Sequence, residues 1–469
     1  DVFYDIAFLV MDLCHRDLRR QGCRVLDAWL RAARGNEDAG LAALPFVILL
    51  LLNSCTPPFD FDVREYHLQG PKEWFQAGRI FFLEHNVYTS FPFLSEMLSL
   101  SGMVLADDWS DGALVGKIVL ACFQLLTTVC VFATCRRWYG TPAALIAVLT
   151  CLSVPWTLRI SLIAYAEGAI TFYLMASVMC GLIASSVPAS SDQRRLMLVT
   201  GLLAGSAMAA KYPGVLSVVI PLGLLLLWSG LKDPQQRAGT LATVTLFSAG
   251  VLVAVGPWLL RNFMDTGNPV YPLLYRVFGA TDWSPAMDAK WKAAHSASEH
   301  AISGIPGHLA SVMLDNDWTS GLLFALAVPG LLVLRNDRPS RWLWFMLLWM
   351  LATWWALTHR IDRFWIPVLP VIAALAGSTW TMFRSSLWRG LMVTAVGICC
   401  LFNLQVWRSG LVGFQAGLMD LETARSMPVR ADFRAMNQTL SSDHRVLMVG
   451  EAEVFDLTVP CLLYTSPSP

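Results

Sequence analysis

One polar stretch, from Phe59 to Glu96, gathers side chains that could do chemistry. It separates two apolar runs, and its charged and imidazole side chains include Asp60, Asp62, Glu65, His67, Lys72, Glu73, Arg79, Glu84, His85 and Glu96. Because these groups need water, the stretch predicts a loop at a membrane face. Aromatic residues recur among them, which favours short helices lying in the interface. We interpret the stretch as the catalytic loop of a membrane enzyme.

Asp62 is the first candidate for a general base in this loop. It lies just past the first apolar run, four residues before Tyr66 and five before His67. A carboxylate at that place could deprotonate a hydroxyl or amine acceptor. The alternative is that Asp60 and Asp62 only cap the following helix, as aspartate often does. Position alone leaves both interpretations open.

The composition of the whole chain is that of an integral membrane protein. Of its 469 residues, 55% are hydrophobic and 14% are charged, whereas soluble domains carry about 25% charged residues. The formal net charge is zero, so the balance does not indicate a nucleic-acid partner. Most of the 11 cysteines fall inside apolar runs without CxxC spacing, so we expect no disulfide framework.

Eleven apolar runs predict an all-α polytopic membrane protein with about 11 transmembrane helices, because lipid cannot satisfy open backbone groups. The runs lie at about 41–53, 113–135, 141–157, 160–187, 196–210, 213–230, 239–260, 318–334, 341–358, 364–383 and 390–407. Basic residues recur at every second connection, which by the positive-inside rule puts the N-terminus in the cytoplasm. The connections 54–112 and 261–317 and the tail after Trp407 are then expected on the non-cytoplasmic face.

The two ends of the chain differ from this transmembrane region, 41–407. Residues 1–40 mix apolar and basic side chains at near-helical spacing, which predicts a cytoplasmic amphipathic segment. Residues 408–460 predict the start of a non-cytoplasmic soluble domain, helical at first and β-type from His444 to Val459. Because the chain begins with Asp1 and has no signal peptide before Leu41, we expect an internal fragment. Residues 461–469, CLLYTSPSP, break the β-type pattern and are expected to be foreign sequence.

A series of motifs gives the chain a family resemblance. In order they are DFDVREYHLQGPKEW, NVYTSFP, RRWYG, SVPW at 153–156, AYAEGA at 164–169, AMAAKYP at 207–213, GPWLLRN at 256–262, TGNPVYPLLY at 266–275 and THRIDRFWIPVLP at 358–370. As a set, over nearly all of 41–460, they resemble the GT-C glycosyltransferases. The most similar members are bacterial enzymes of the protein O-mannosyltransferase and lipid A aminoarabinose transferase type, labelled dolichyl-phosphate-mannose type.

The resemblance implies an inverting transferase with a GT-C fold. It implies transfer of a sugar from a polyprenyl phosphate to a protein, lipid or polysaccharide acceptor on the non-cytoplasmic face, in a bacterial plasma membrane. The family base is an acidic residue of the first outer loop, followed a few residues on by an aromatic position. Asp62 with Tyr66 matches that spacing better than Asp60. The frequent Asp-Glu pair of the family is absent because Val63 follows Asp62, so both aspartates stay candidates.

A phosphate site is expected from two groups of basic residues. Lys211 ends an apolar run, where a cation is costly unless it has a partner, and a lipid-linked phosphate is a suitable one; snorkelling to the interface is the alternative. His359, Arg360, Asp362 and Arg363 form a second polar knot. We assign one of Arg360 and Arg363 to the phosphate, whose developing charge needs stabilisation, and let Asp362 pair with the other.

The remaining candidates complete a substrate pocket. Tyr66, His67 and Glu96 are expected to shape the site of the sugar. Glu167 lies inside an apolar run and is either a functional group or the structural partner of Lys211 or Arg159. His359 and Asp362 are included because they neighbour the two arginines in sequence.

No metal or nucleotide is strictly required for this chemistry. Some relatives hold a divalent metal, but the outer-loop histidines lack the i, i+4 or HxH spacing of a ready-made site, so a metal is only the lesser expectation. Two rival functions remain: a transporter or flippase of lipid-linked sugars, and an inactive scaffold subunit with the same fold.

Overall fold

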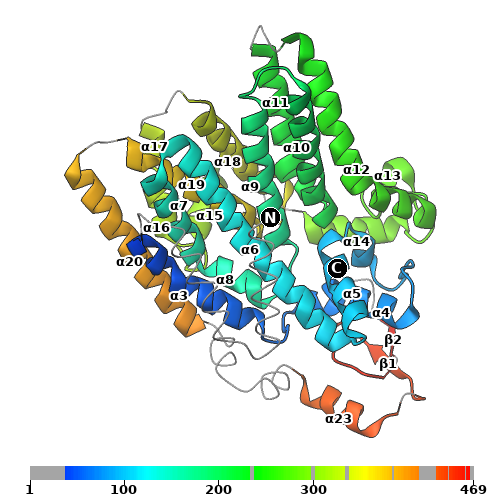
Figure 1. Ribbon diagram of the computed structural model, residues 1–469. Coiled ribbons are helices and arrows are strands. Elements are labelled where there is room, and N and C mark those ends of the chain that lie inside the picture. The colour runs from blue at the N-terminus through cyan, green and yellow to red at the C-terminus, as the bar shows by residue number, and fades with distance from the viewer. Residues whose placement is uncertain are drawn as a thin grey trace.

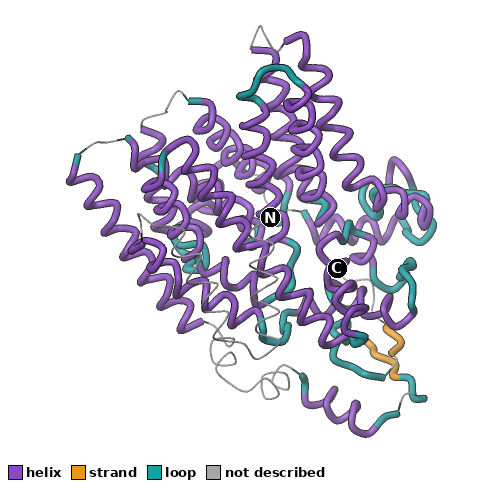
Figure 2. Tube along the Cα trace, viewed as in Figure 1, coloured by secondary structure: helices purple, strands orange, loops and turns teal. Residues whose placement is uncertain are grey.

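The computed structural model describes residues 37–232, 237–296, 301–332, 337–382, 385–410, 429–441, 443–459 and 461–464. Within these ranges the protein is almost entirely helical, and Figure 2 shows the strands confined to one small corner. The amphipathic segment predicted at 1–40 lies outside the described residues except for 37–40.

The first half of the chain forms a helical bundle interrupted by one long loop (Figure 1). The elements up to the end of that loop are α3 (Glu37–Ser54), η1 (Val63–His67), α4 (Gln69–Ala77), η2 (Val87–Ser90) and α5 (Leu94–Ala106). The bundle continues with α6 (Trp109–Tyr139), α7 (Thr141–Ser153), α8 (Pro155–Leu162), α9 (Glu167–Ala184), α10 (Ser191–Ala210), η3 (Val215–Val219), α11 (Ile220–Lys232), η4 (Arg237–Gly239) and α12 (Thr240–Thr266).

The second half adds another loop, the remaining bundle helices and a short mixed segment. The second loop contains α13 (Tyr275–Phe278), α14 (Pro285–His295), η5 (Ile302–Gly304) and α15 (Ile305–Met313). The helices that follow are α16 (Gly321–Ala327), α17 (Pro329–Leu332), α18 (Arg338–Leu357), η6 (Asp362–Val368), α19 (Leu369–Ser378), η7 (Thr379–Thr381) and α20 (Ser386–Gly410). The C-terminal segment contains α23 (Ala431–Thr439), β1 (Val446–Val449) and β2 (Cys461–Tyr464).

Six helical stretches among the described residues are long and apolar enough to cross a membrane. They are Trp109–Tyr139, Glu167–Ala184, Val215–Lys232, Thr240–Thr266, Asp362–Thr381 and Ser386–Trp407, and three shorter apolar helices are Ala42–Ser54, Leu94–Ala106 and Thr141–Ser153. The predicted count of 11 spans is therefore not confirmed. Three of the predicted runs are interrupted: the one at 141–157 is divided between α7 and α8, the one at 160–187 between α8 and α9, and the one at 318–334 between α16 and α17.

α19 lies at the centre of the bundle. All of its residues are buried, and it follows directly from η6, which carries the Asp362 and Arg363 part of the polar knot. Around it the helices approach closely through small residues, as in membrane proteins generally. A Cβ at Gly112 of α6 would overlap the Met103 backbone of α5, so glycine there lets the first loop pack directly on the bundle.

The two long loops and the C-terminal segment meet at one end of the bundle (Figure 1). Tyr88 of the first loop lies 5.4 Å from Trp291 of α14, measured between ring centroids. Arg261 near the end of α12 donates to the carbonyls of Thr89 and Phe81. This agrees with the prediction that both polar connections share one face.

The C-terminal segment forms less strand than its sequence predicts. Of the β-type run from His444 to Val459, only β1 is a strand, and it pairs in parallel with β2, at the start of the stretch expected to be foreign. Most of the rest of the run packs irregularly against the first loop. Phe455 meets Trp109 edge to face, with ring centroids 4.9 Å apart.

Candidate active site

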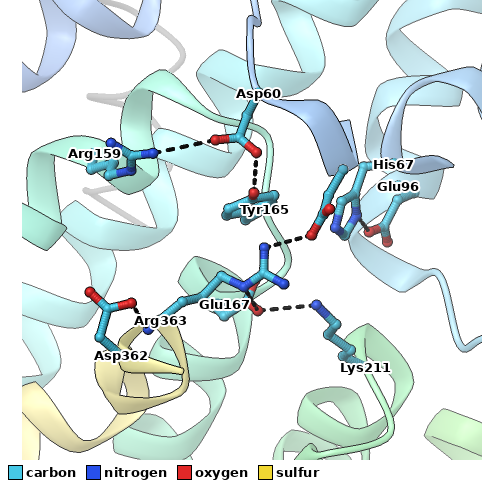
Figure 3. A network of polar contacts seen from close by, with 10 residues as sticks. Asp60, His67, Glu96, Arg159, Tyr165, Glu167, Lys211, Asp362 and Arg363 are labelled. Carbon is cyan, nitrogen blue, oxygen red and sulfur yellow. Dashed lines mark hydrogen bonds and ion pairs between the residues drawn. The ribbon is translucent and has the colours of Figure 1, made fainter. Parts of the chain in front are cut away.

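Asp60 is held in place through both of its carboxylate oxygens. Oδ1 accepts a hydrogen bond from the Tyr165 hydroxyl, and Oδ2 lies 3.4 Å from Nη2 of Arg159 (Figure 3). Tyr165 belongs to the turn before α9, and burial raises its pKa well above the usual value, so the hydroxyl stays a donor. These contacts give Asp60 a structural partner on each side.

Asp62 has a different environment, because only one of its oxygens is engaged. Oδ2 accepts a hydrogen bond from Nη1 of Arg363 at 2.7 Å, and Oδ1 accepts none from the described residues. Asp62 precedes η1 without making a side-chain capping bond. The capping alternative is therefore wrong for Asp62, and its carboxylate stays partly accessible.

Arg363 and Lys211 converge on one buried carboxylate, that of Glu167 (Figure 3). Lys211 Nζ lies 3.1 Å from Glu167 Oε1, and Arg363 Nε lies 3.7 Å from the same oxygen. The side chain of Glu167 is 3% exposed, and its second oxygen has no hydrogen-bond partner among the described residues. Of the predicted partners of Glu167, Lys211 is confirmed, whereas Arg159 binds Asp60 instead.

Helix ends place these charges. Lys211 follows the last residue of α10, Glu167 begins α9, and Arg363 lies in the first turn of η6. Three segments that are distant in sequence thus bring one anion and two cations to the same place. The Arg363 guanidinium also lies over the Tyr165 ring, 4.6 Å from its centroid, which fixes its plane.

A mostly apolar pocket opens beside Lys211. It is lined by Glu167, Ile170, Lys211, Pro213, Leu216, Ser217, Met350, Thr353, Trp354, Thr358, Phe364, Pro367 and Val368. Its charged lining residues are Glu167 and Lys211, and most of the others come from η3, α18 and η6. A cation at one side of an apolar pocket suits a ligand with a phosphate and a hydrocarbon chain.

The predicted sugar-pocket residues form a buried cluster next to the aspartates. His67 Nδ1 contacts Glu96 Oε1. The Tyr66 ring stacks on Tyr88, with centroids 4.7 Å apart, and lies tilted against His67, with centroids 4.2 Å apart. Burial raises the pKa of Tyr66 well above its usual value. Tyr66, His67 and Glu96 thus lie together, and their role in shaping the site of the sugar stays a prediction.

The polar knot at 359–363 divides between two surroundings. Arg360 donates to the Trp355 carbonyl and lies 3.1 Å from Nε2 of His308, away from the Glu167 cluster. His359 packs against His295 and Phe364, with ring centroids 5.8 and 5.1 Å away. Only Arg363 reaches both Asp62 and Glu167.

The expected ion pair of Asp362 with an arginine is wrong for the described residues. Asp362 accepts hydrogen bonds from the Asn316 side-chain amide at 3.0 Å and from the Arg363 backbone N–H at 2.8 Å. The carboxylate thereby fixes the start of η6, while the Arg363 guanidinium is free to reach across to the first loop.

Sequence reasoning missed two structural features of the site. One is Tyr165, which binds Asp60 and supports Arg363; its place two residues before Glu167, within the AYAEGA motif, was the available signal. The other is the C-terminal segment. Arg64, between Asp62 and His67, pairs with Glu453 at 3.0 Å and Asp456 at 3.2 Å.

Lys72 makes a second connection to the C-terminal segment. Its Nζ donates to the carbonyls of Phe455 at 2.8 Å and Leu457 at 2.5 Å, and it lies 4.0 Å from the Trp109 ring centroid. Burial lowers its pKa to about 8. No hydrophobic or charge pattern in the sequence pairs residue 72 with residues nearly 400 positions later.

The acidic side chains of the site are engaged by cations of the protein itself. In the part of the chain that the structure describes, no group of three or more His, Cys, Asp or Glu side chains is arranged to hold a metal ion. Asp60, Asp62 and Glu167 are each paired with a cationic side chain instead.

Two family models match separate parts of the chain. The dolichyl-phosphate-mannose-protein mannosyltransferase model matches residues 117–266, and the Alg9-like mannosyltransferase model matches residues 308–451. A comparison with the sequences of curated proteins finds no significant match.

Solved structures share the fold. ArnT from Cupriavidus metallidurans bound to undecaprenyl phosphate matches with a TM-score of 0.64 and 15% identity, over 90% of this chain and 85% of ArnT. The apo form of the Archaeoglobus fulgidus oligosaccharyltransferase matches with a TM-score of 0.52 and 14% identity, over 92% of this chain and 64% of that protein.

The fold and the two family matches lead to the same class. The protein is an integral membrane protein that crosses the bilayer several times, with a GT-C fold like that of ArnT. The chain therefore combines matches to two mannosyltransferase families with a GT-C fold, as in membrane glycosyltransferases that use dolichyl- or polyprenyl-phosphate sugar donors.

Proposed function

We propose that the protein transfers a sugar from a polyprenyl phosphate to an acceptor on the non-cytoplasmic face of the membrane, with inversion at the anomeric carbon. The observation that carries this proposal is the line of groups from Asp62 through Arg363 and Glu167 to Lys211, beside an apolar pocket. It offers a carboxylate with one unengaged oxygen next to two cations, which are the two requirements of this displacement.

Asp62 is the general base in this proposal, and Asp60 is its structural neighbour. Both oxygens of Asp60 are occupied, whereas Oδ1 of Asp62 accepts no hydrogen bond from the described residues. The acceptor hydroxyl or amine gives its proton to Asp62 as its lone pair forms the new bond to the anomeric carbon. The bond from that carbon to the phosphate oxygen breaks at the same time, and its electron pair leaves with the polyprenyl phosphate.

Lys211 and Arg363 bind the donor phosphate and stabilise the charge that develops on it. Lysine has three N–H donors, and Glu167 occupies one of those of Lys211, so others remain for an anion. Arg363 offers a planar fork suited to phosphate oxygens. The apolar wall of Leu216, Met350 and Trp354 then accommodates the first part of the polyprenyl chain.

The donor set supports a reaction without a bound metal. The leaving group is a phosphate, and two cationic side chains provide the electrostatic stabilisation, typically a few kcal/mol for each well-aimed donor. The experiment that follows identifies the sugar and the acceptor, which is a protein, a lipid or a polysaccharide. We place the enzyme in a bacterial plasma membrane.

Donor turnover tests the proposal. Purified protein in detergent receives radiolabelled polyprenyl-phosphate sugars and crude membranes as the acceptor source. We expect wild type to move label to an acceptor, Asp62→Asn to lose turnover by about 100-fold or more while still binding donor, and Asp60→Asn to keep a larger share of activity. Donor that binds without any transfer by wild type, or equal turnover in Asp62→Asn, contradicts the proposal and favours a flippase or scaffold.

A further inference from the structure

His67 has one satisfied and one unsatisfied ring nitrogen. Its Nδ1 contacts Oε1 of Glu96, whose other oxygen accepts a hydrogen bond from Ser95 Oγ at 2.7 Å. The imidazole is 2% exposed, and Nε2 has no hydrogen-bond partner among the described residues. Buried histidines that serve only the core normally pair both nitrogens, so the unpaired Nε2 is an incomplete site.

The ring that carries this nitrogen is held rigidly beside the aspartates. Tyr66 lies against it, Phe93 stacks at 6.3 Å and Tyr165 lies 5.4 Å away, measured between ring centroids. In Figure 3 His67 lies between Tyr165 and Glu96. Since Tyr165 also binds Asp60 and supports Arg363, His67 belongs to the wall of the same site.

Glu96 determines which proton the imidazole carries. A carboxylate accepts a hydrogen bond and donates none, so Nδ1 must hold a proton toward it. In the neutral ring Nε2 then carries a lone pair and can only accept a hydrogen bond, and none of the described residues donates one to it. A phosphate oxygen would be repelled there because it too is an acceptor. A sugar hydroxyl has the donor that the nitrogen lacks.

We propose that His67 Nε2 accepts a hydrogen bond from a hydroxyl of the transferred sugar, and that Glu96 is a positioning residue that fixes the tautomer. The inference rests on the proposed function, because it places the sugar of the donor next to Asp62. It adds a specificity element: the pair recognises the sugar, whereas Lys211 and Arg363 recognise the phosphate.

The test measures binding, so that it does not depend on turnover. The probes are bare undecaprenyl phosphate and undecaprenyl phosphate carrying mannose, the sugar named by both matched families, together with a small panel of other hexoses and pentoses. His67→Asn retains an N–H where Nδ1 stands but has no atom at Nε2. We expect it to weaken binding of the preferred sugar-bearing lipid about tenfold and to leave binding of bare undecaprenyl phosphate unchanged.

Two further variants separate recognition from folding. Glu96→Gln can donate to Nδ1 and so allow the opposite tautomer, and we expect it to lose the preference for the sugar although it does not touch the ligand. The matched control is His85→Asn, in a more exposed His–Glu pair of the same loop in which His85 Nε2 lies 3.1 Å from Glu73. It should bind every probe as wild type does.

Monodeoxy analogues of the preferred sugar identify the hydroxyl. One analogue should bind wild type about tenfold more weakly than the parent sugar-bearing lipid does. His67→Asn should bind that analogue as tightly as wild type binds it. The proposal is overturned if His67→Asn weakens the bare and the sugar-bearing lipids equally, if it weakens neither, or if no sugar of the panel strengthens binding to wild type. Turnover that is absent while this pattern of binding is present contradicts the proposed transferase activity and leaves the sugar site standing.

Discussion

Arg363 Nη1 lies 2.7 Å from Asp62 Oδ2, although the two residues are 301 positions apart in the sequence. The same guanidinium approaches Glu167, the partner of Lys211, so one side chain connects the proposed base with the proposed phosphate site. In the proposed reaction, a phosphate that draws Arg363 toward itself would release the carboxylate of Asp62, and the arrangement would then couple the two halves of the reaction.

We predict that Arg363→Gln lowers kcat by about 100-fold, because it removes one of two cations from the leaving phosphate. Arg360→Gln provides the matched control from the same polar knot, since Arg360 contacts the Trp355 carbonyl and His308 instead. Its kcat should stay within about threefold of wild type. Steady-state transfer of radiolabelled sugar measures both, and the reverse order of the two variants contradicts the assignment of Arg363 to the phosphate.

Lys211 and Glu167 should affect lipid phosphate binding in opposite directions. Lys211→Met removes a cation beside the apolar pocket, and we expect undecaprenyl phosphate to bind about tenfold more weakly. Glu167→Gln removes the anion that occupies Lys211 and should bind the lipid at least as tightly as wild type. Equilibrium binding in detergent measures both variants. Weakening by Glu167→Gln to the same degree as Lys211→Met would mean that the pair is purely structural.

The fold and the chemistry of the site could be predicted from the sequence to different degrees. Polar residues within apolar runs are costly, so Glu167 and Lys211 stood out, and their pairing was among the expected alternatives. The sequence could not show which of Arg360 and Arg363 reaches the proposed phosphate site. That choice depends on the backbone at Arg360, whose positive φ of 61° turns the two side chains into different surroundings. The count of spans was uncertain for a similar reason, since hydropathy does not show where the chain breaks between α8 and α9.

The attachment of the C-terminal segment was beyond sequence reasoning. In the sequence, Lys72 is one of many charged residues of the first loop. In the structure it is 3% exposed and donates to two carbonyls of the C-terminal segment. We predict that Lys72→Met lowers the free energy of unfolding by about 1–3 kcal/mol, because both carbonyls lose their donor. Thermal unfolding in detergent tests this, with the exposed Arg79→Met of the same loop as a control that should change little. A stability equal to that of the control would show that water replaces Lys72 without cost.

Chelation gives a test of the metal-free reaction. Because the carboxylates of the site are paired with Arg159, Arg363 and Lys211, we expect turnover to persist after treatment with EDTA and passage over a chelating resin. Readdition of Mg²⁺ or Mn²⁺ should change the rate less than about twofold, as expected when cationic side chains supply the electrostatic stabilisation. A rate that falls on chelation and returns with one of these ions contradicts this prediction and requires a metal-binding arrangement of the carboxylates.

Glu65 gives the protein a stability that depends on pH near neutrality. Burial, followed by the nearby charges of Asp62 and Glu451, raises its pKa from 4.5 to about 7. The folded state therefore holds this proton more tightly than the unfolded state. The stabilisation is fully present below about pH 4.5 and is lost as the pH rises through 7, to a limit of about 3 kcal/mol.

Glu65→Gln should remove this dependence because its amide stays neutral. We expect the variant and wild type to unfold at similar temperatures at pH 5 and the variant to be the more stable at pH 8, with thermal unfolding in detergent as the measurement. Glu84→Gln, an exposed residue of the same loop, should run parallel to wild type across the range. If Glu65→Gln also runs parallel, then the carboxylate of Glu65 is as well solvated in the folded protein as in the unfolded chain, and its burial in η1 does not hold in solution.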